Sequence, residues 1–372
     1  MINEKHVIAR ELGADWIATA NDVWSELLQR SHVNSIFMSW EWISSWMETL
    51  GLEKDVRILG LFEDNKLVGV APFLLSRSLK VMWGRSISLF GVDETGADYN
   101  DIVCARGSED KVAQAVADWL IARGDWVRCE FRDILPTALI RRVAELMATD
   151  SKVEDIAGSV CPRTYLANGW QGILRERFDR KRRYNIERQM RIAVDRDGHR
   201  FVIYDTPESI SEAFPVLVKL HNERKNAVSV KSAFSKLDRL NFHFHTASKL
   251  AGQRKGAFIA TLESRQEILS AAYCFRDRSC LYYFQTGMSS AGSELGSGST
   301  LLYMLLRWAA DQGYEWFDFL KGDEDYKNAW TTDRVEQRIV TVTRTTVRGR
   351  AGLAMAGMRR ALILLLKKSG VK

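Results

Sequence analysis

The sequence predicts an α/β (α+β) protein of two domains in tandem, each a mixed, mostly antiparallel sheet flanked by helices. The 372 residues suffice for two domains of ordinary size. In both halves, short β-branched and aromatic runs bounded by turn residues alternate with longer apolar patterns of helical period. Between Asp150 and Gln171 the periodicity is lost, which indicates the domain boundary. The expected domains are residues 1–155 and 165–347, followed by a tail at 348–372.

The elements of the first half follow this pattern in order. The sequence predicts a helix over 15–30, a loop and helix over 35–50, a hairpin of strands 56–62 and 67–75, strands at 86–90 and 101–104, a helix over 111–122, a strand at 126–131 and a helix over 136–147. Four acidic residues surround Tyr99: Asp93, Glu94, Asp98 and Asp101. This loop either faces a substrate or is a solvated loop.

The second half repeats the alternation of helices and strands. The expected elements are a helix over 174–193, a strand at 201–204, helices over 210–224 and 240–250, a hairpin of strands 256–262 and 268–276, a strand at 280–286, a helix over 301–308, a strand at 316–320 and a closing strand at 338–345. Gly287 is interpreted as a turn signal after the 280–286 strand. Gly313 is placed as the C-terminal cap of the helix.

Composition limits the compartment and the partners. Hydrophobic residues make up 46% of the chain and charged residues 27%, and the formal net charge is +6. This mild, diffuse excess suits an anionic cofactor or a membrane surface, and we expect no nucleic acid as partner. The five cysteines form no Cys-x-x-Cys pair and no metal-ligand spacing appears, so we expect a reduced, cytoplasmic protein without a metal. No apolar leader or spanning segment is expected.

A strand, a glycine-rich turn and a helix follow one another in the last third of the chain. The strand leads into Gly296, Ser297, Gly298 and Ser299, after which the apolar helix begins. The first N–H groups of a helix lack internal partners, and the helix dipole favours negative charge there. The turn does not meet the dinucleotide fingerprint, because Leu301 occupies the third glycine position, nor the P-loop pattern. It therefore predicts a short pyrophosphate site, or a plain glycine-rich turn.

Two segments here resemble a known family. The turn resembles the Gln/Arg-x-x-Gly-x-Gly/Ala loop with which GNAT acyltransferases hold the pyrophosphate of acyl-coenzyme A, although Ser293 stands in the Gln/Arg place. The longer run FDFLKGDEDYKNAW, Phe317 to Trp330, resembles the CelD/BcsL branch of GNAT proteins, which is related to the FemABX peptidyltransferases. Lys181 to Ile186 also resembles the FemABX signature, and Leu220-His221-x-x-Arg224 matches the CelD-type pattern.

The resemblance implies tandem GNAT-like domains, the first degenerate and the second an acyl-CoA-dependent N-acyltransferase. It implies acetyl-CoA or another acyl-CoA as donor and an amine as acceptor, on a surface polysaccharide or on a lipid-linked or long-chain molecule. The expected cofactor-binding residues are Phe284, Gln285, Thr286, Gly296, Ser297, Gly298 and Ser299. The expected substrate-binding residues are Arg224 and Tyr283.

Direct transfer needs a donor to the thioester carbonyl, a base for the amine and an acid for the thiolate. A backbone N–H between Tyr283 and Gly287 can be the carbonyl donor. The candidate bases are His221, Asp318 and Asp323, Tyr326 is the candidate acid, and Lys327 can stabilise developing negative charge. Asp318 and Asp323 are equally suited to cap the turn, and the sequence does not rank these residues.

Two other functions stay open at this point. One is a non-catalytic GNAT-like module that binds a nucleotide or a lipid, which the serine at 293 favours. The other is aminoacyl transfer as in FemABX. The tail, Arg348 to Lys372, holds seven Lys and Arg and no acidic residue around an apolar stripe. It predicts either a helix docked on the protein or peripheral attachment to an anionic membrane at its inner face.

Overall fold

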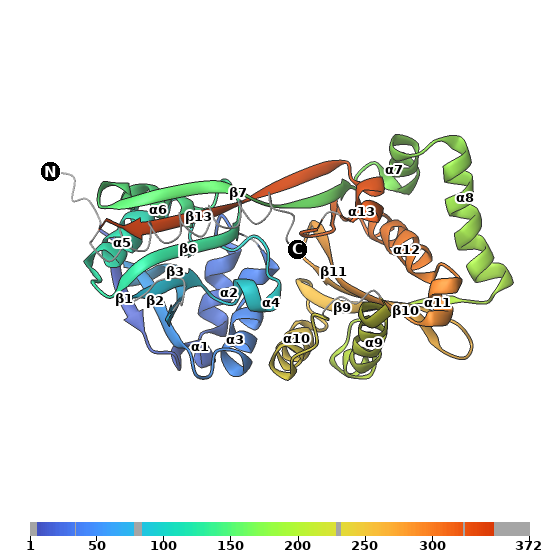
Figure 1. Ribbon diagram of the computed structural model, residues 1–372, viewed down its shortest axis with the longest axis horizontal. Helices are drawn as coiled ribbons and strands as arrows, with labels where there is room; N and C mark the ends of the chain where they lie inside the picture. The colour runs from blue at the N-terminus through green and yellow to red at the C-terminus, as the bar shows by residue number, and fades with distance from the viewer. Residues whose placement is uncertain (1–5, 34, 78–83, 228–231, 323, 346–372) are drawn as a thin grey trace, which may run out of the picture. The chain divides into compact units, whose positions relative to one another are not determined.

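A computed structural model describes residues 6–33, 35–77, 84–227, 232–322 and 324–345 (Figure 1). The chain divides into two compact units. Of the described residues, unit 1 takes those within Met1–Ser44, Gly51–Gly158 and Gln337–Lys372, and unit 2 those within Ser45–Leu50 and Ser159–Glu336. The sequence-based domain bounds stay a prediction, and the expected tail helix lies outside the described residues.

The first part of the chain forms seven strands and six α-helices within the described residues. These are β1 (Ile8–Leu12), α1 (Trp16–Thr19), α2 (Asn21–Gln29), α3 (Trp40–Thr49), β2 (Asp55–Glu63), β3 (Lys66–Arg77), β4 (Arg85–Leu89), α4 (Val92–Thr95), β5 (Val103–Cys104), α5 (Glu109–Ala122), β6 (Trp126–Ile134), α6 (Leu139–Leu146) and β7 (Ser151–Tyr165).

In unit 1, α5 covers one face of the sheet that β1, β2 and β3 form. Alternate residues of β3 and β6 point to this face, as the period of two requires. The ring of Phe73 stacks on Trp119 of α5, with centroids 5.7 Å apart, and also meets Phe131 of β6 at 6.4 Å. Phe73, Trp119 and Phe131 all lie in segments whose apolar residues recur at strand or helix spacing. The sequence pattern therefore predicts this core of unit 1.

The second part of the chain contributes the remaining elements. These are α7 (Gly169–Arg177), α8 (Arg180–Arg191) with a π-turn at Ile192–Arg196, β8 (Arg200–Tyr204), α9 (Pro207–Ala227), α10 (Leu237–Leu250), β9 (Gly256–Glu263), β10 (Ile268–Arg276), β11 (Cys280–Met288), α11 (Ser290–Glu294), α12 (Ser297–Asp311), β12 (Trp316–Asp318), α13 (Asp325–Trp330) and β13 (Asp333–Arg344).

Unit 2 is a three-layer arrangement. Helices α9 and α10 pack on one side of strands β9, β10 and β11, and α12 packs on the other, next to α7 and α8 (Figure 1). Leu301 and Leu305 of α12 are buried against Phe258 and Phe317 of the sheet. The apolar run that predicted this helix therefore marks the face that covers the sheet.

The two units repeat one strand order. In unit 1, β1, β2, β3 and β4 are successively antiparallel, β4 is parallel to β6, and β6 is antiparallel to β13. In unit 2, β8, β9, β10 and β11 are antiparallel, β11 is parallel to β12, and β12 is antiparallel to β7. A helix, α5 or α12, precedes the fifth strand in each unit. The predicted tandem α/β fold with mostly antiparallel sheets is confirmed.

Residues 150–171 depart most from the expected structure. The loss of helical and alternating periodicity indicated an irregular boundary, yet the segment contains the 15-residue strand β7. Its exposure does not alternate cleanly, so the period-two signal is weak. Gly158 lies inside the strand, where an added Cβ would be 3.1 Å from the carbonyl oxygen of Gln337. The glycine permits a close backbone approach within the strand.

Two of the acidic residues around Tyr99, Asp98 and Asp101, are buried and not solvated. Asp101 is 3% exposed, and its two carboxylate oxygens accept hydrogen bonds from the backbone N–H groups of Leu139 (2.8 Å) and Ile140 (2.9 Å) at the start of α6. It also accepts from Nε2 of His32 at 3.2 Å. Asp98 is buried and accepts from Gln337 at 2.8 Å. Both carboxylates therefore join segments distant in sequence.

Asp101→Asn should lower the free energy of unfolding by about 1–2 kcal/mol, because an amide offers one acceptor where the carboxylate offers two. Urea unfolding followed by circular dichroism measures the loss. Asp118→Asn is the matched control, since Asp118 lies on the exposed side of α5 and accepts only from Gln114. Equal stabilities of the two variants would contradict the capping role of Asp101.

None of the helices in the described part of the chain combines the length and apolar character needed to cross a bilayer. Within the same residues, no group of three or more His, Cys, Asp or Glu side chains is arranged to hold a metal ion. All five cysteines are buried thiols without a disulfide.

Candidate active site

Strands β11 and β12 separate in the middle of unit 2. Their parallel register runs from Cys280 opposite Trp316 to Tyr282 opposite Asp318 and ends there, although β11 continues to Met288. On its other side, β11 pairs with β10 through a shift between Tyr273 and Cys274, which inserts Phe284 as an extra residue. A bulge redirects the backbone and interrupts the ladder. The stretch from Tyr283 to Gly287 thus presents an edge that β12 does not cover.

Gly287 is a packing residue and not the turn that the sequence indicated. It lies within β11, and an added Cβ would be 2.3 Å from the backbone nitrogen of His221 on α9. The absence of a side chain lets α9 lie directly against the strand. This contact brings the Leu-His-x-x-Arg segment of α9 onto the C-terminal half of β11.

His221 and Arg224 both contact Thr286 of β11. Nδ1 of His221 lies 2.8 Å from the carbonyl oxygen of Thr286, and Nη1 of Arg224 donates to its hydroxyl at 2.6 Å. His221 is 1% exposed, and its Nε2 has no hydrogen-bond partner among the described residues. Because a carbonyl only accepts, Nδ1 carries the proton and Nε2 carries the lone pair.

The protonation state of His221 is set mainly by burial. Burial lowers its pKa to about 4, and the positive charges of Lys225 and Arg224 act in the same direction against the contact with Thr286. The ring is therefore neutral near pH 7, which is the form that a general base requires.

Stability should consequently fall on acidification. The unfolded histidine has its ordinary pKa of about 6.5, so the stabilisation from a neutral buried ring is complete above that pH and is lost as the pH falls toward 4. Urea unfolding at about pH 7.5 and about pH 5 should show a larger loss for the wild type than for His221→Gln. Equal losses in the two proteins would contradict this assignment.

Two phenols lie near this contact. Burial raises the pKa of Tyr283 on β11, and the neighbouring Tyr326 raises it further. Burial and the carboxylate of Glu324 raise the pKa of Tyr326, which is the second residue of α13. Arg224 opposes both shifts, which shows that its charge reaches both rings. The two phenols keep their protons near neutral pH, so each can donate one.

The charged turn before α13 is held by its own ion pair. Lys327 is 5% exposed, and its Nζ donates to the carbonyl oxygen of Lys321 at 3.1 Å and pairs with Glu324 at 2.8 Å. Burial disfavours the charged carboxylate of Glu324, yet the pair with Lys327 outweighs it and lowers the pKa of Glu324. The ammonium of Lys327 thus anchors the turn in this structure.

Of the two aspartates predicted as candidate bases, the structure describes Asp318. Asp318 is 3% exposed, and its Oδ1 accepts from the backbone N–H of Leu320 at 2.7 Å. Leu320 has a φ of +56°, so this hydrogen bond supports a left-handed backbone that leucine rarely adopts. Asp318 therefore occupies the turn-capping position that the sequence left open. Asp323 lies outside the described residues.

The glycine turn begins α12 as expected. Gly296 is the N-cap residue with a φ of +65°. Ser297 is buried, its hydroxyl donates to the carbonyl oxygen of Leu269 at 3.4 Å, and its own carbonyl accepts from Ser270 at 3.2 Å. The side chain of Ser297 therefore fastens the helix to β10, whereas its N–H belongs to the helix terminus. Ser299 is exposed.

Two residues that support the start of α12 were not among the predicted site residues. Gln189 of α8 donates to the hydroxyl of Thr300 at 2.8 Å and to the carbonyl oxygen of Gly296 at 3.4 Å. Gly292 of α11 has no room for a side chain, since a Cβ would be 2.2 Å from the carbonyl oxygen of Leu269. The glycine spacing offered a signal for Gly292, whereas nothing in the pattern of the basic helix singled out Gln189.

The structure thus brings His221, Arg224, Tyr283, Thr286 and Tyr326 together beside the open edge of β11. Phe284 and Gln285 belong to the same edge, and Gly296–Ser299 form the start of α12, which comes after β11 and the short helix α11. Such a site offers backbone N–H groups for a carbonyl, a helix N-terminus for an anion and phenols for proton donation.

Comparisons with known proteins agree with this geometry. Residues 180–328 match the family model of the acetyltransferase (GNAT) domain. No curated protein sequence matches the chain. FemX shares its fold at 12% identity, with 89% of this chain and 96% of FemX covered and a TM-score of 0.61.

Two further solved structures share the fold. One is the C-terminal domain of a putative lysylphosphatidylglycerol synthetase from Agrobacterium fabrum, at 14% identity, with 91% of this chain and 95% of that one covered and a TM-score of 0.54. The other is a conserved protein of unknown function from Bacteroides thetaiotaomicron, at 8% identity, with 90% and 99% covered and a TM-score of 0.57. Residues 180–328 are therefore similar to the acetyltransferase (GNAT) domain, and the chain shares its fold with FemX.

Proposed function

We propose that unit 2 transfers an acyl group from acyl-coenzyme A to an amine. The observation that carries this proposal is the separation of β11 from β12 directly after Tyr282, at a bulge, with the glycine-capped helix α12 beginning after the short helix α11. An extended pantetheine arm can lie along the uncovered edge of β11, and its pyrophosphate can reach the N–H groups of Ser297, Gly298 and Ser299. Phe284, Gln285 and Thr286 then line the arm.

The chemistry assigned to the side chains is a direct transfer. The amine nitrogen attacks the thioester carbon, whose oxygen is stabilised by a backbone N–H between Tyr283 and Gly287. The carbon–nitrogen bond forms and the carbon–sulfur bond breaks. Tyr326 gives its proton to the thiolate, and Nε2 of His221 is the candidate that accepts the proton of the amine. Arg224 positions the edge through Thr286, and Lys327 positions Tyr326 by anchoring the turn.

The proposed acceptor is an amino sugar of a surface polysaccharide or a lipid-linked or long-chain amine. The basic tail at 348–372 supports a membrane-proximal acceptor, because about 1 kcal/mol is gained for each basic residue near an anionic leaflet. This segment lies outside the described residues, so its support comes from the sequence alone.

A thiol-release assay tests the proposal. The full chain is incubated with acetyl-, octanoyl- or palmitoyl-CoA and with glucosamine, a polyamine or a long-chain amine, and the thiol of released coenzyme A is titrated. The five protein thiols are buried, so they add little background. We expect thiol release that requires both an acyl-CoA and an amine. Release that no amine accelerates, with any of the donors, would contradict the proposal.

Gly298→Val should weaken the binding of coenzyme A about 10-fold or more without unfolding the protein, because a β-carbon obstructs the approach of a phosphate. The substitution is tolerable for the fold, since the atom nearest to the added Cβ is the terminal methyl group of Met288 at 2.5 Å. Calorimetry measures the affinity and circular dichroism the fold. An unchanged affinity in the folded variant would exclude this helix terminus as the pyrophosphate site.

Aminoacyl transfer is the second candidate, favoured by the fold shared with FemX and with the synthetase domain. It predicts that aminoacyl-tRNA replaces acyl-CoA as the donor. The same incubation with radiolabelled aminoacyl-tRNA distinguishes the two, because transfer from tRNA and not from acyl-CoA would reassign the donor.

A further inference from the structure

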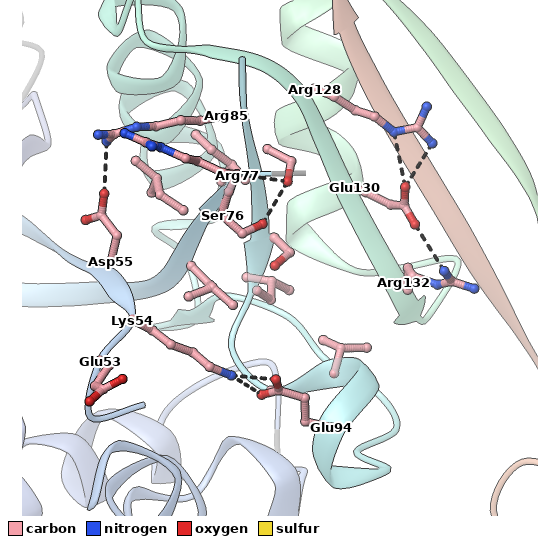
Figure 2. A pocket seen from close by; sticks show the side chains of 18 residues that line it. Glu53, Lys54, Asp55, Ser76, Arg77, Arg85, Glu94, Arg128, Glu130 and Arg132 are labelled. Carbon is pink, nitrogen blue, oxygen red and sulfur yellow. Dashed lines mark hydrogen bonds and ion pairs between the residues drawn. The ribbon is translucent and has the colours of Figure 1, made fainter. Parts of the chain in front are cut away.

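A cavity lies wholly within unit 1. It has a volume of about 570 Å³ and is formed by β3, β4 and β6 with the residues before β2 and those of α4. Five basic side chains line it, those of Lys54, Arg77, Arg85, Arg128 and Arg132 (Figure 2). We call it the arginine cavity.

The floor of the arginine cavity is the polar face of the sheet. In β6, Cys129 and Phe131 are fully buried, whereas the alternate residues Arg128, Glu130 and Arg132 point to the other face. In β4 the hydroxyl groups of Ser86 and Ser88 alternate with buried apolar residues in the same way. A strand face of this kind normally meets bulk water, and here charged side chains border it.

Of the four acidic side chains that line the cavity, Glu53, Asp55, Glu94 and Glu130, all but Glu53 form ion pairs with its basic residues. Glu130 lies between Arg128 at 2.9 Å and Arg132 at 3.1 Å. Asp55 pairs with Arg85 at 2.9 Å, and Glu94 pairs with Lys54. Arg77 differs from the other four basic residues, because no described carboxylate pairs with it. With five basic and four acidic side chains, the lining has a net charge of +1, and Arg77 is its basic residue without a paired carboxylate among the described residues.

Arg77 also lies next to a second arginine, Arg85. Arg77 is the direct cross-strand partner of Arg85, so two guanidinium groups stand side by side at one end of the cavity (Figure 2). Like charges in directly opposed positions destabilise a sheet pair. An anion between them would relieve the repulsion, and two planar guanidinium groups offer the paired donors that a phosphate group accepts.

We propose that the arginine cavity binds a phosphorylated, hydroxyl-rich small molecule of the sugar-phosphate class. The phosphate would lie between Arg77 and Arg85. The hydroxyls of Ser76, Ser86 and Ser88 and the carboxylate of Glu130 would meet the hydroxyls of the sugar. No aromatic ring is among the described residues that line the cavity, so it offers no stacking surface for a nucleobase. Its volume is in the range of small-ligand sites.

Calorimetry and thermal unfolding of the full chain test this site. The probes are glucose 1-phosphate, glucosamine 6-phosphate, glucose, inorganic phosphate and AMP. The variant is Arg77→Glu, which removes the unpaired charge and can pair with Arg85, so the protein without ligand should unfold at an unchanged or slightly higher temperature. Arg106→Glu is the matched control, an exposed arginine of unit 1 outside the cavity.

We expect at least one sugar phosphate to bind the wild type and the control, and to bind Arg77→Glu at least about 10-fold more weakly. Glucose should not bind. Failure of both sugar phosphates to bind, or binding that Arg77→Glu leaves unchanged, overturns the proposal. Equal affinity for inorganic phosphate or for AMP overturns the sugar-phosphate class. These results are independent of acyl transfer, because no residue of the strand edge in unit 2 is altered.

Discussion

Tyr326→Phe should lower kcat about 100-fold to 1,000-fold and leave the affinity for acyl-CoA unchanged, as expected for loss of a general acid. Burial keeps the phenol protonated, and Arg224 is close enough to stabilise the phenolate that forms when the proton leaves. Phenylalanine preserves the ring that meets Phe319 at 6.5 Å, so the turn before α13 should keep its structure.

Steady-state kinetics with saturating amine measures this effect, and calorimetry measures donor binding. Tyr184→Phe is the control, because Tyr184 is a 58% exposed phenol on α8. A Tyr326→Phe enzyme whose turnover stays within about 3-fold of the wild type would exclude the phenol as the acid.

Gly287→Ala should destabilise the protein by about 2–3 kcal/mol and abolish most of its activity. The added methyl group would collide with the backbone of His221 and Leu220, which cannot rotate away as a side chain can. Helix α9 must then move off β11, and the contacts of His221 and Arg224 with Thr286 are lost.

Urea unfolding and turnover are compared with those of Gly124→Ala. Gly124 has no atom within 4 Å of the position of an added Cβ, so this substitution should change stability by no more than about 0.5 kcal/mol. Similar stabilities for the two variants would show that α9 does not depend on the close approach at Gly287.

Much of the fold follows from local patterns. Strands β10 and β11 were expected from β-branched and aromatic runs, and the α12 helix from its apolar stripe, because burial of one face imposes these periods. The helix α13 was missed, since the charged run from Asp325 to Trp330 has only two buried positions, Lys327 and Trp330. A short helix that buries so little leaves almost no periodic signal.

The candidate site is harder to predict from the sequence than the fold is, because its geometry depends on contacts between distant segments. The glycine turn and the charged run gave local signals for Gly296, Gly298 and Tyr326. The role of Gly287 depends on α9, some 60 residues earlier in the chain, and the turn interpretation used only its neighbours. Likewise, the burial that keeps His221 neutral arises from packing and has no signature in Leu-His-x-x-Arg.

The most direct test of the account is the binding of the donor. Calorimetric titration of the full chain with acetyl-CoA and palmitoyl-CoA should give one site per chain, which Gly298→Val weakens and Gly124→Ala preserves. The result that would contradict the account is the absence of binding to either acyl-CoA by the folded wild-type protein, together with binding of aminoacyl-tRNA under the same conditions.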